Sequence, residues 1–320
     1  MGTGLTPVTI SCSVFWDVKL SKRKDMSDLM NRFCSEESCR IYIEQLRWPE
    51  GYKCSRCGCD KHWKTKRGLN VCSKCQYQQS PLVGTIFQDT HIPLRIWFQA
   101  IWWFTSQKSG ASAQSLQRVL GLKGHEPAWL MLHKLRIAMI RPDRDQLTGE
   151  VEVDEGYFGG TGNKHLVGVA AEVRGSRIGR IRMQTIRDRS GLVLQSFVKQ
   201  HITAGATIVT DGLKSYCGVE KEGYSHKPLR KPYFWEDQNP EDDRLLPRVH
   251  KVISLAKGWV FGTYQGSVDP RYFDSYLNEF VFRFNRRTSR SRGLLFHRLL
   301  ENAVAVGSVP QKRIKAQSNL

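Results

Sequence analysis

VEVDEGYFGG, residues 151–160, is the stretch from which the fold of this chain can be read. Apolar Val151 and Val153 alternate with Glu152 and Asp154, as in a β-strand with one buried face, and the stretch ends in two glycines that favour a turn. Three of its residues are carboxylates, in a chain whose formal net charge is +19. Asp154 is therefore either a solvated group on a strand or the first member of a functional site.

The segments after this strand predict an α/β domain. Residues 165–173 and 177–186 have the composition of two further strands, with short turns before each. Residues 190–202 predict a helix, and the apolar run at 206–211 predicts a fourth strand. Three consecutive strands, a helix and another strand indicate an α/β sheet with flanking helices. A polar loop then leads to a further helix at about 248–261.

A second carboxylate, Asp211, stands at the end of the fourth predicted strand, where Gly212 lets the backbone turn away. Residues at strand ends line the crevice in which ligands bind to open sheets. Two aspartates brought together there repel each other unless a cation lies between them, and Mg²⁺ and Mn²⁺ prefer carboxylate oxygens. Asp154 and Asp211 therefore predict a metal site of the kind that serves phosphoryl transfer, although spacing alone leaves two surface aspartates as an equal alternative.

Four of the nine cysteines form two C-x-x-C pairs separated by 14 residues; they are Cys54, Cys57, Cys72 and Cys75. In a reducing compartment, two such pairs at this separation predict a structural zinc site with four thiolate ligands. The alternative, a redox motif or free buried thiols, stays open, but a redox motif needs only one pair. Cys59 lies close enough to substitute for a ligand and is left outside the predicted set.

The net charge of +19 favours a polyanionic partner, because cationic surfaces attract polyanions and release their counterions. Nucleic acid is the first candidate and an anionic membrane surface the second. The most apolar run, at residues 94–104, is interrupted by Arg95 and Gln99 and is too short to span a bilayer. With no signal peptide recognisable in the sequence, we expect a soluble, cytoplasmic protein.

Helices are predicted on both sides of the cysteine pairs. Residues 35–48 begin with an N-cap serine, residues 93–105 begin with Pro93, and residues 112–120 and 127–140 form a helix pair with glycines in the turn. The pair has the size of a helix-turn-helix that binds DNA, although its turn is longer than usual. An ordinary pair of antiparallel helices is the alternative.

Taken together, the motifs resemble those of a bacterial insertion-sequence transposase with an N-terminal zinc ribbon and a DDE-type, ribonuclease-H-like catalytic domain. The stretches that carry the resemblance are LRWPEGYKCSRCG, SPLVGTIFQDTHIPLRIWFQAIW, VEVDEGYFGG, VTDGLKSY, HKVISLAKGWVFGTYQGSV and YLNEFVFRFNRR. They run in order from about residue 30 to 305. The resemblance implies a mixed sheet flanked by helices, preceded by a small zinc ribbon and a helix-turn-helix-like segment.

The resemblance also assigns roles to site residues. Asp154 matches the first catalytic aspartate and Asp211 the second, while the third position, which varies among Glu, Asn and His, falls on His250. A companion lysine follows seven residues later as Lys257, on the same helix face. His250 is expected either to bind Mg²⁺ or Mn²⁺ with the aspartates or to transfer a proton near the leaving oxygen. The competing acids are Glu241, Asp242 and Asp243.

Two neighbours of these residues have weaker assignments. Glu155 points away from Asp154 on a strand and is interpreted as a supporting or structural group. Lys257 is expected to contact a DNA phosphate near the scissile bond, with a solvated helix lysine as the alternative.

Three clusters of cationic side chains are predicted to contact double-stranded DNA, at the transposon ends and the target. They lie in the ribbon hairpin, in the second helix of the pair and in the C-terminal arginine segment: Lys64, Lys66 and Arg67; Lys134 and Arg136; Arg283, Arg286 and Arg287. The ribbon and helix pair are expected to recognise the ends and the C-terminal arginines to hold the backbone. A homodimer or higher assembly is expected, because two ends must be joined.

These expectations describe a nucleoid-associated DNA transposase that needs structural Zn²⁺ and catalytic Mg²⁺ or Mn²⁺. The expected organisation is an N-terminal extension (1–26), a zinc ribbon with its preceding helix (27–90), a helical DNA-binding segment (91–145), a ribonuclease-H-like catalytic domain (146–305) and a basic tail (306–320). Two alternatives remain: a catalytically altered zinc-ribbon regulator that only binds DNA, and a metal-dependent nuclease that cuts without strand transfer.

Overall fold

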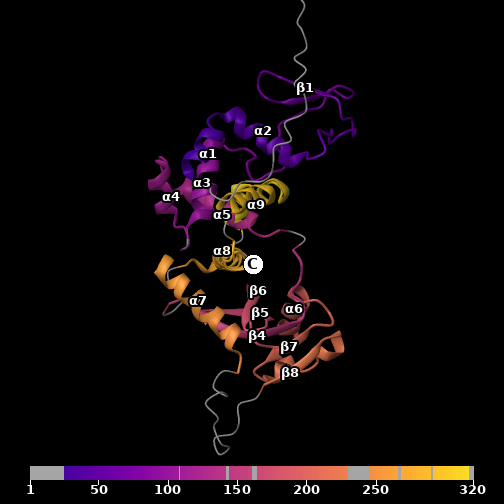
Figure 1. The fold of residues 1–320 in the computed structure, drawn as a ribbon, viewed down its shortest axis with the longest axis vertical. Coiled ribbons are helices and arrows are strands. Elements are labelled where there is room, and N and C mark those ends of the chain that lie inside the picture. The colour runs from indigo at the N-terminus through magenta and orange to yellow at the C-terminus, as the bar shows by residue number, and fades with distance from the viewer. Residues whose placement is uncertain are drawn as a thin grey trace, which may run out of the picture.

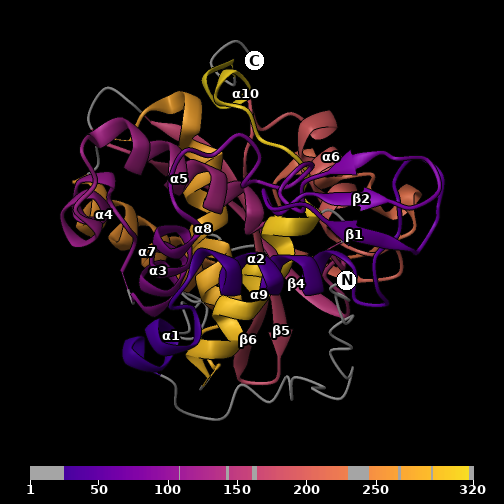
Figure 2. The ribbon, with the colours of Figure 1, turned by 90° about the horizontal axis from the view of Figure 1, so that it is seen from above.

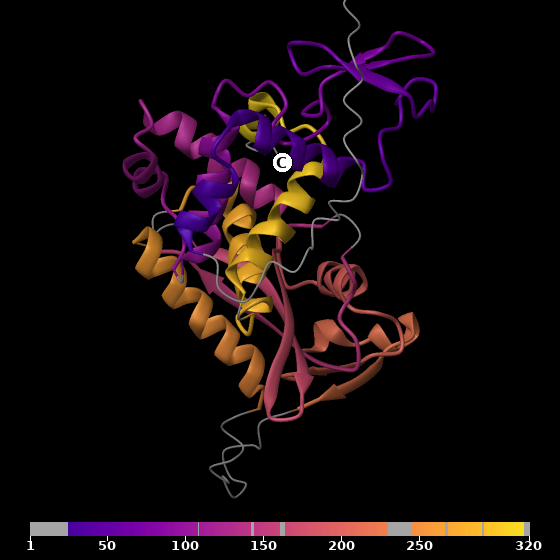
Figure 3. The same cartoon turned by 45° about the horizontal axis from the view of Figure 1, so that its top comes forward.

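A computed structural model describes residues 25–107, 109–141, 144–160, 164–229, 245–265, 268–289 and 291–316. The described chain has a body of helices at one end and a five-stranded sheet with its own helices at the other (Figure 1). A small three-stranded ribbon projects beyond the helices, on the side away from the large sheet (Figure 3). The sheet and the ribbon carry the two predicted metal sites.

The ribbon follows two short helices. Helix α1 (Met26–Arg32) precedes α2 (Glu36–Arg47), whose N-cap Ser35 accepts a hydrogen bond from the backbone of Ser38, as the sequence predicts. The antiparallel strands are β1 (His62–Lys64), β2 (Asn70–Cys72) and β3 (Gln78–Gln79). Their apolar cluster is small, with Tyr52, Cys54 and Cys72 as its buried members. The ribbon therefore lacks a hydrophobic core large enough to hold its shape alone.

The helical body consists of α1 and α2 with five further helices: α3 (Leu94–Ser106), α4 (Ala113–Leu120), α5 (His125–Ala138), α9 (Arg292–Ala305) and α10 (Gln311–Ala316). Aromatic α3 and α9 pack together at its centre, and Phe296 of α9 contacts the rings of Phe33, Phe98 and Trp102. Figure 2 shows α9 crossing beneath α2. Helix α9 therefore packs within the helical body, and the catalytic-domain boundary expected at residue 305 stays a prediction.

The large sheet has the order β6–β5–β4–β7–β8 and is mixed. Its strands are β4 (Glu150–Phe158), β5 (His165–Arg174), β6 (Arg177–Thr185), β7 (Thr207–Thr210) and β8 (Ser225–Pro228). Strands β4, β5 and β6 form an antiparallel meander, whereas β7 pairs in parallel with both β4 and β8. The α/β prediction is confirmed. The edge strand β8 was not predicted, because SHKP shows no apolar alternation.

Helices cover both faces of this sheet. On one face α6 (Gly191–His201) packs with the short 3-10 helices η1 (Lys214–Tyr216) and η2 (Val219–Glu222). On the other face lie α7 (Pro247–Tyr264) and, after the 3-10 turn η4 (Pro270–Tyr272), α8 (Phe273–Asn285). Figure 1 shows α8 between the sheet and the helical body. Helix α8 thus contacts both halves of the molecule.

A buried ion pair joins α8 to the helical body. Glu279 of α8 is fully buried; its Oε2 lies 2.9 Å from Nε of Arg136 on α5, and its Oε1 lies 2.8 Å from Nη2 of Arg283. Burial alone would lower the pKa of Arg136, but the neighbouring Tyr264 and Glu279 outweigh it and raise the pKa above its ordinary value. A backbone N–H, that of Ala111, also donates to Glu279. The carboxylate is thus paired, as buried charges must be.

Candidate active site and zinc centre

The alternation along β4 separates its carboxylates onto two faces. Glu152 and Asp154 share the face that α7 covers, because they pair with Ala171 and Val169 of β5, both members of the core beneath that helix. Val151 and Val153 face α6 instead. Successive residues of a strand point to opposite faces, so the sequence VEVD presents two acids to one helix.

Glu152 binds the N-terminus of α7. Its Oε2 accepts hydrogen bonds of 2.8 Å from the backbone N–H groups of Arg248 and Val249, and its Oε1 lies 2.9 Å from Nη1 of Arg248. The first N–H groups of a helix have no partner within the helix, and a carboxylate there also interacts favourably with the helix dipole. Glu152 is buried and therefore fixes the start of α7 against the sheet. The sequence analysis assigned it no role, although its position two residues before Asp154 was a usable signal.

Asp154 lies on β4, and Asp211 directly follows the last residue of β7, the parallel neighbour of β4. The β4–β7 register pairs Glu152 with Val209, so Asp154 and Asp211, each two residues further along, come level where β7 ends. Gly212, with φ of 81°, turns the chain there, and Oδ1 of Asp211 accepts a 3.0 Å hydrogen bond from the backbone of Leu213. Asp211 is exposed, whereas the side chain of Asp154 is 16% exposed. The parallel pairing therefore brings the two predicted carboxylates together.

His250 and Lys257 approach from α7. His250 follows Val249 directly, and its Nε2 lies 3.2 Å from Oδ2 of Asp154. Lys257, about two turns later, has its Nζ 5.7 Å from the ring centroid of Phe158 on β4. Both side chains line an open cavity of about 470 Å³ together with Asp154. The competing acids Glu241, Asp242 and Asp243 lie outside the described residues.

Burial raises the pKa of Asp154, and repulsion from Asp211 adds to that increase, while a backbone hydrogen bond and His250 oppose it. Burial of Asp154 and the nearby charge of Asp211 thus both disfavour the ionised form of the Asp154 carboxylate. A divalent cation would relieve this repulsion, and carboxylate oxygens are the ligands that Mg²⁺ and Mn²⁺ prefer. The metal site at these two aspartates stays a prediction.

Glu155 occupies the opposite face of β4, as its place on the strand predicts. The buried hydroxyl of Tyr216 in η1 donates a hydrogen bond to its Oε1, and Nε of Arg189 lies 3.5 Å from its Oε2. Burial raises the pKa of Glu155, against the effect of the Tyr216 hydrogen bond. Neither Tyr216 nor Arg189 was singled out from the sequence. Together they hold the residue next to Asp154 in place.

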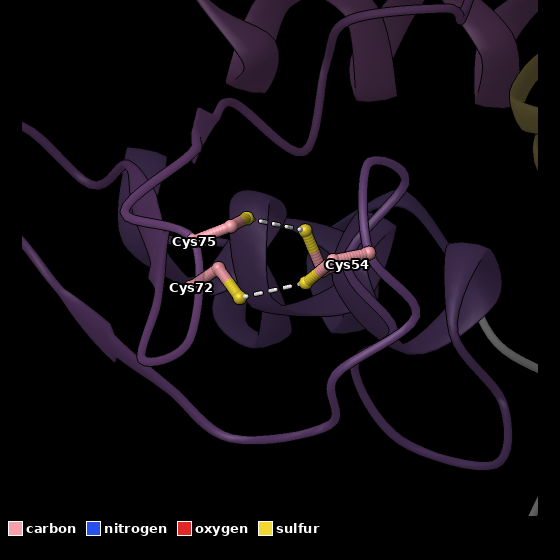
Figure 4. A group of neighbouring side chains, drawn as sticks. Cys54, Cys72 and Cys75 are labelled. Carbon is pink, nitrogen blue, oxygen red and sulfur yellow. Dashed lines mark hydrogen bonds between the residues drawn. The ribbon is translucent and has the colours of Figure 1, made fainter.

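The four predicted zinc ligands gather at one end of the ribbon. Their sulfur atoms all lie within 4.8 Å of one another, with 3.6 Å between Cys54 and Cys75 and 3.5 Å between Cys57 and Cys72. Figure 4 shows the sulfurs pointing toward one another. A tetrahedral zinc site with Zn–S bonds of about 2.3 Å places its sulfurs about 3.8 Å apart, so the group fits such an ion closely. Cys59 is not part of this group.

The ribbon hairpin keeps its predicted cations on the surface. Lys66 and Arg67 are exposed in the turn between β1 and β2, beside the half-exposed ring of Trp63. Lys64 is also exposed, although its Nζ lies 2.7 Å from Oε2 of Glu44 on α2. This hairpin is therefore available to a partner.

The cations predicted on α5 and α8 are placed differently, and two of them correct the sequence analysis. Arg136 is 2% exposed and Arg283 is 12% exposed, and both pair with Glu279, so neither is a surface contact for DNA. Lys134 is half-buried and donates to the backbone carbonyl of Ile86. Arg287 is exposed. The sequence could not distinguish these roles, because the partner acid is 143 residues from Arg136.

The C-terminal arginines that remain near the surface stack on neighbouring rings. Arg286 lies 4.0 Å from the ring centroid of Phe282, and Arg287 lies 4.0 Å from that of Phe284. Arg286 is partly buried and Arg287 donates to the backbone carbonyls of Ile178 and Gly179.

This architecture, a mixed sheet with Asp154 on β4 and Asp211 just after β7, together with a separate four-cysteine ribbon, is that of a ribonuclease-H-like domain joined to a zinc ribbon. Residues 146–285 match the ISXO2-like transposase domain, and residues 34–78 match the transposase zinc-ribbon domain. The chain thus carries the zinc ribbon and the DDE-type domain of an insertion-sequence transposase.

One curated relative, described as an uncharacterized protein in transposable element ISH50 of Halobacterium salinarum, is 26% identical over 129 residues. The match covers 39% of this chain and 42% of that protein, less than half of its length. Among solved structures, a chain from the simian T-cell lymphotropic virus intasome in complex with PP2A regulatory subunit B56 gamma is 14% identical. That match covers 58% of this chain and 71% of the other, with a TM-score of 0.32. Among the described residues, no helix has the length and apolarity to cross a membrane.

We predict that the purified protein contains about one zinc ion per chain. Cys54→Ser or Cys72→Ser should abolish zinc binding, because each removes one of four thiolates, whereas Cys59→Ser should retain it, because Cys59 lies outside the group. Elemental analysis by mass spectrometry measures the metal content. The assignment would be contradicted if the purified wild-type protein contained no zinc, or if Cys59→Ser lost as much zinc as Cys54→Ser.

We predict that Glu152→Ala lowers the free energy of unfolding by about 2 kcal/mol, because it leaves buried N–H groups of α7 without an acceptor. Glu152→Gln should lose less, since an amide oxygen can still accept both hydrogen bonds. Exposed Glu150 begins the same strand, and Glu150→Ala should change stability by no more than about 0.5 kcal/mol. Urea denaturation measures the free energy of unfolding of the three variants. Equal losses of stability in Glu152→Ala and Glu150→Ala would refute the capping role of Glu152.

Proposed function

We propose that this protein is a DNA transposase that hydrolyses a phosphodiester at each transposon end and transfers the freed strand into target DNA. The observation that carries the proposal is that Asp154 on β4 comes level with Asp211, which directly follows the parallel strand β7, and that His250 lies 3.2 Å from Asp154. The transposase domains matched at 34–78 and 146–285 support the same class of reaction. The first displacement uses water and the second uses the freed 3′-hydroxyl, so neither requires a covalent bond between protein and DNA.

Asp154, Asp211 and His250 are the residues that would hold Mg²⁺ or Mn²⁺. Such an ion, when bound, supplies activation of the attacking oxygen and charge stabilisation at the leaving oxygen. Asp154 is held in place by β4, whose neighbouring Glu155 is bound by Tyr216. Lys257 lines the same cavity and would contact a phosphate oxygen of the scissile strand. The protein thus orients the reacting phosphate from the sheet and from α7.

His250 replaces the third acid of the site, which leaves the metal with one negative ligand fewer. We propose that its Nε2, which lies next to Asp154, binds the ion. Imidazole suits Mn²⁺ better than Mg²⁺, so the proposed site should favour Mn²⁺. The alternative is that His250 moves a proton at the leaving oxygen.

The remaining parts of the proposal concern the partner and assembly. We propose that the ribbon holds structural Zn²⁺ and presents Lys64, Lys66 and Arg67 to the transposon ends, because this hairpin is exposed. Two ends must be cut and joined together, so two or more copies should assemble on DNA. Because DNA is the proposed substrate, we propose that the protein acts at the nucleoid, in the cytoplasm.

We predict that the protein forms strand-transfer products when incubated with end-containing DNA, a target plasmid and Mn²⁺. Asp154→Ala and Asp211→Ala should each lower product formation by at least about 100-fold, because each removes a carboxylate needed at the metal site. Glu150→Ala, on the same strand but exposed, should leave it unchanged. Gel electrophoresis of labelled DNA measures cleavage and joining separately.

The same assay separates the two alternative functions. Binding without cleavage in either metal would favour a DNA-binding regulator, and cleavage without joined products would favour a nuclease. Full activity in Asp154→Ala would refute the assignment of the catalytic site.

We predict that His250→Ala lowers activity by about 10-fold or more, whereas His250→Glu retains activity and shifts the preference from Mn²⁺ toward Mg²⁺, because it restores a carboxylate ligand. The ratio of rates in the two metals is the measurement. An unchanged ratio in His250→Glu with full activity in His250→Ala would show that His250 is not a ligand.

A further inference from the structure

An arginine-rich cleft lies where the helical body meets the edge strand β6. Its volume is about 630 Å³, and its walls come from the segment that joins α5 to β4 and from β6, α8 and α9. We call it the arginine cleft, after the six arginines that line it: Arg141, Arg144, Arg180, Arg182, Arg286 and Arg298. None of these residues lines the cavity at Asp154. The cleft is therefore a separate feature of the surface.

Positive charge in the arginine cleft exceeds the negative charge available to it. Two carboxylates line the cleft. Asp145 lies 3.3 Å from Arg141 and 3.7 Å from Arg180, and Glu301 lies 3.0 Å from Arg298. Arg180 pairs with Glu172 at 2.6 Å. Three arginines make no ion pair with any carboxylate of the described residues, namely Arg144, Arg182 and Arg286. The cleft is thus left with uncompensated guanidinium groups.

These groups also repel one another. Burial, together with the nearby charges of Arg144 and Arg180, lowers the pKa of Arg182 to about 10, although Glu172 and Asp145 oppose the decrease. Burial lowers the pKa of Arg286 as well, with added repulsion from Arg298 and Arg141. Cations held close together in excess of the neighbouring acids are stabilised by a bound anion.

We propose that the arginine cleft binds the phosphodiester backbone of DNA at a distance from the catalytic carboxylates. This inference rests on the proposed function, because it takes DNA as the partner. Planar guanidinium groups match phosphate oxygens with two parallel hydrogen bonds, and they carry no information about base sequence. The ring of Phe282 holds the guanidinium of Arg286 in place at 4.0 Å, which reduces the entropy lost when it binds a phosphate.

The arginine cleft lies between the helical body and the catalytic sheet. One wall belongs to α9 of the helical body, and the others include β6 and α8 beside the catalytic sheet. A DNA backbone bound here touches both halves of the molecule. It therefore fixes the path of the duplex relative to the site on β4 without contacting that site.

The test uses the double variant Arg144→Gln/Arg286→Gln in the full-length protein. Its control, Arg177→Gln/Lys221→Gln, removes the same charge from two exposed residues that line neither cavity. Fluorescence anisotropy measures the affinity for a labelled duplex of about 30 base pairs and arbitrary sequence over a series of salt concentrations. The cleft variant should bind about 10-fold more weakly, and its slope of log K against log salt should fall by about 2, since each phosphate contact contributes about 0.9. The control should bind within about twofold of wild type.

Failure of the inference can be told apart from failure of the proposed function. Wild-type protein that binds no duplex would overturn both. Binding by wild type with equal slopes in the cleft variant and the control would overturn the cleft alone, and strand transfer would still be expected. If the cleft variant no longer bound poly-glutamate but bound duplex as tightly as wild type, the cleft would be assigned to an acidic protein partner instead.

A second measurement needs no variant. Phenylglyoxal modifies accessible arginines, and peptide mass spectrometry locates the modified residues in wild-type protein with and without duplex. Arg144 and Arg286 should be protected by DNA, while Arg177 remains reactive. Equal modification of Arg144 and Arg286 in free and DNA-bound protein would overturn the proposal even if the double variant failed to fold.

Discussion

The contact between Glu152 and the first turn of α7 is the constraint on which the candidate active site depends. Glu152 accepts two backbone hydrogen bonds of 2.8 Å from α7 and pairs with Arg248. The next residue of α7 is His250, and two residues along β4 is Asp154. The contact of Glu152 with the start of α7 therefore also fixes Asp154 relative to His250, because β4 and α7 are rigid over this distance. Asp211 then joins the site through the parallel pairing of β7 with β4.

A second buried carboxylate, Glu279, determines how the two halves of the molecule meet. It lies on α8, beneath the helical body, and is enclosed by Arg136 and Arg283. Removing either arginine would leave a buried charge without its full set of partners, which is costly in a protein interior. Part of the large positive charge of this chain is thus structural. Among the described residues, the cations that we propose to contact DNA lie on the ribbon hairpin and in the arginine cleft.

The two proposed metal sites answer different physical needs. The ribbon has three short strands and a small apolar cluster, so four thiolates around an ion would replace the core that it lacks. The carboxylate site instead sits on a sheet already packed on both faces by helices. A metal there would contribute chemistry, and the sheet would keep its shape without it. Loss of zinc should therefore unfold the ribbon, whereas loss of Mg²⁺ or Mn²⁺ should stop the reaction alone.

The sequence by itself determined the elements whose patterns are local. The alternation of VEVD predicts β4, the apolar run before Asp211 predicts β7, and the spacing of the four cysteines predicts their grouping, because each signal lies within one short stretch of the chain. It did not reveal the cap formed by Glu152, the edge strand β8, the burial of Arg136 or the packing of α9 in the helical body. Each of these depends on a partner far away in the chain. In the sequence, an arginine that contacts DNA cannot be distinguished from one that pairs with a buried acid 143 residues away. Only the tertiary structure, which brings Glu279 to Arg136, shows that Arg136 is of the second kind.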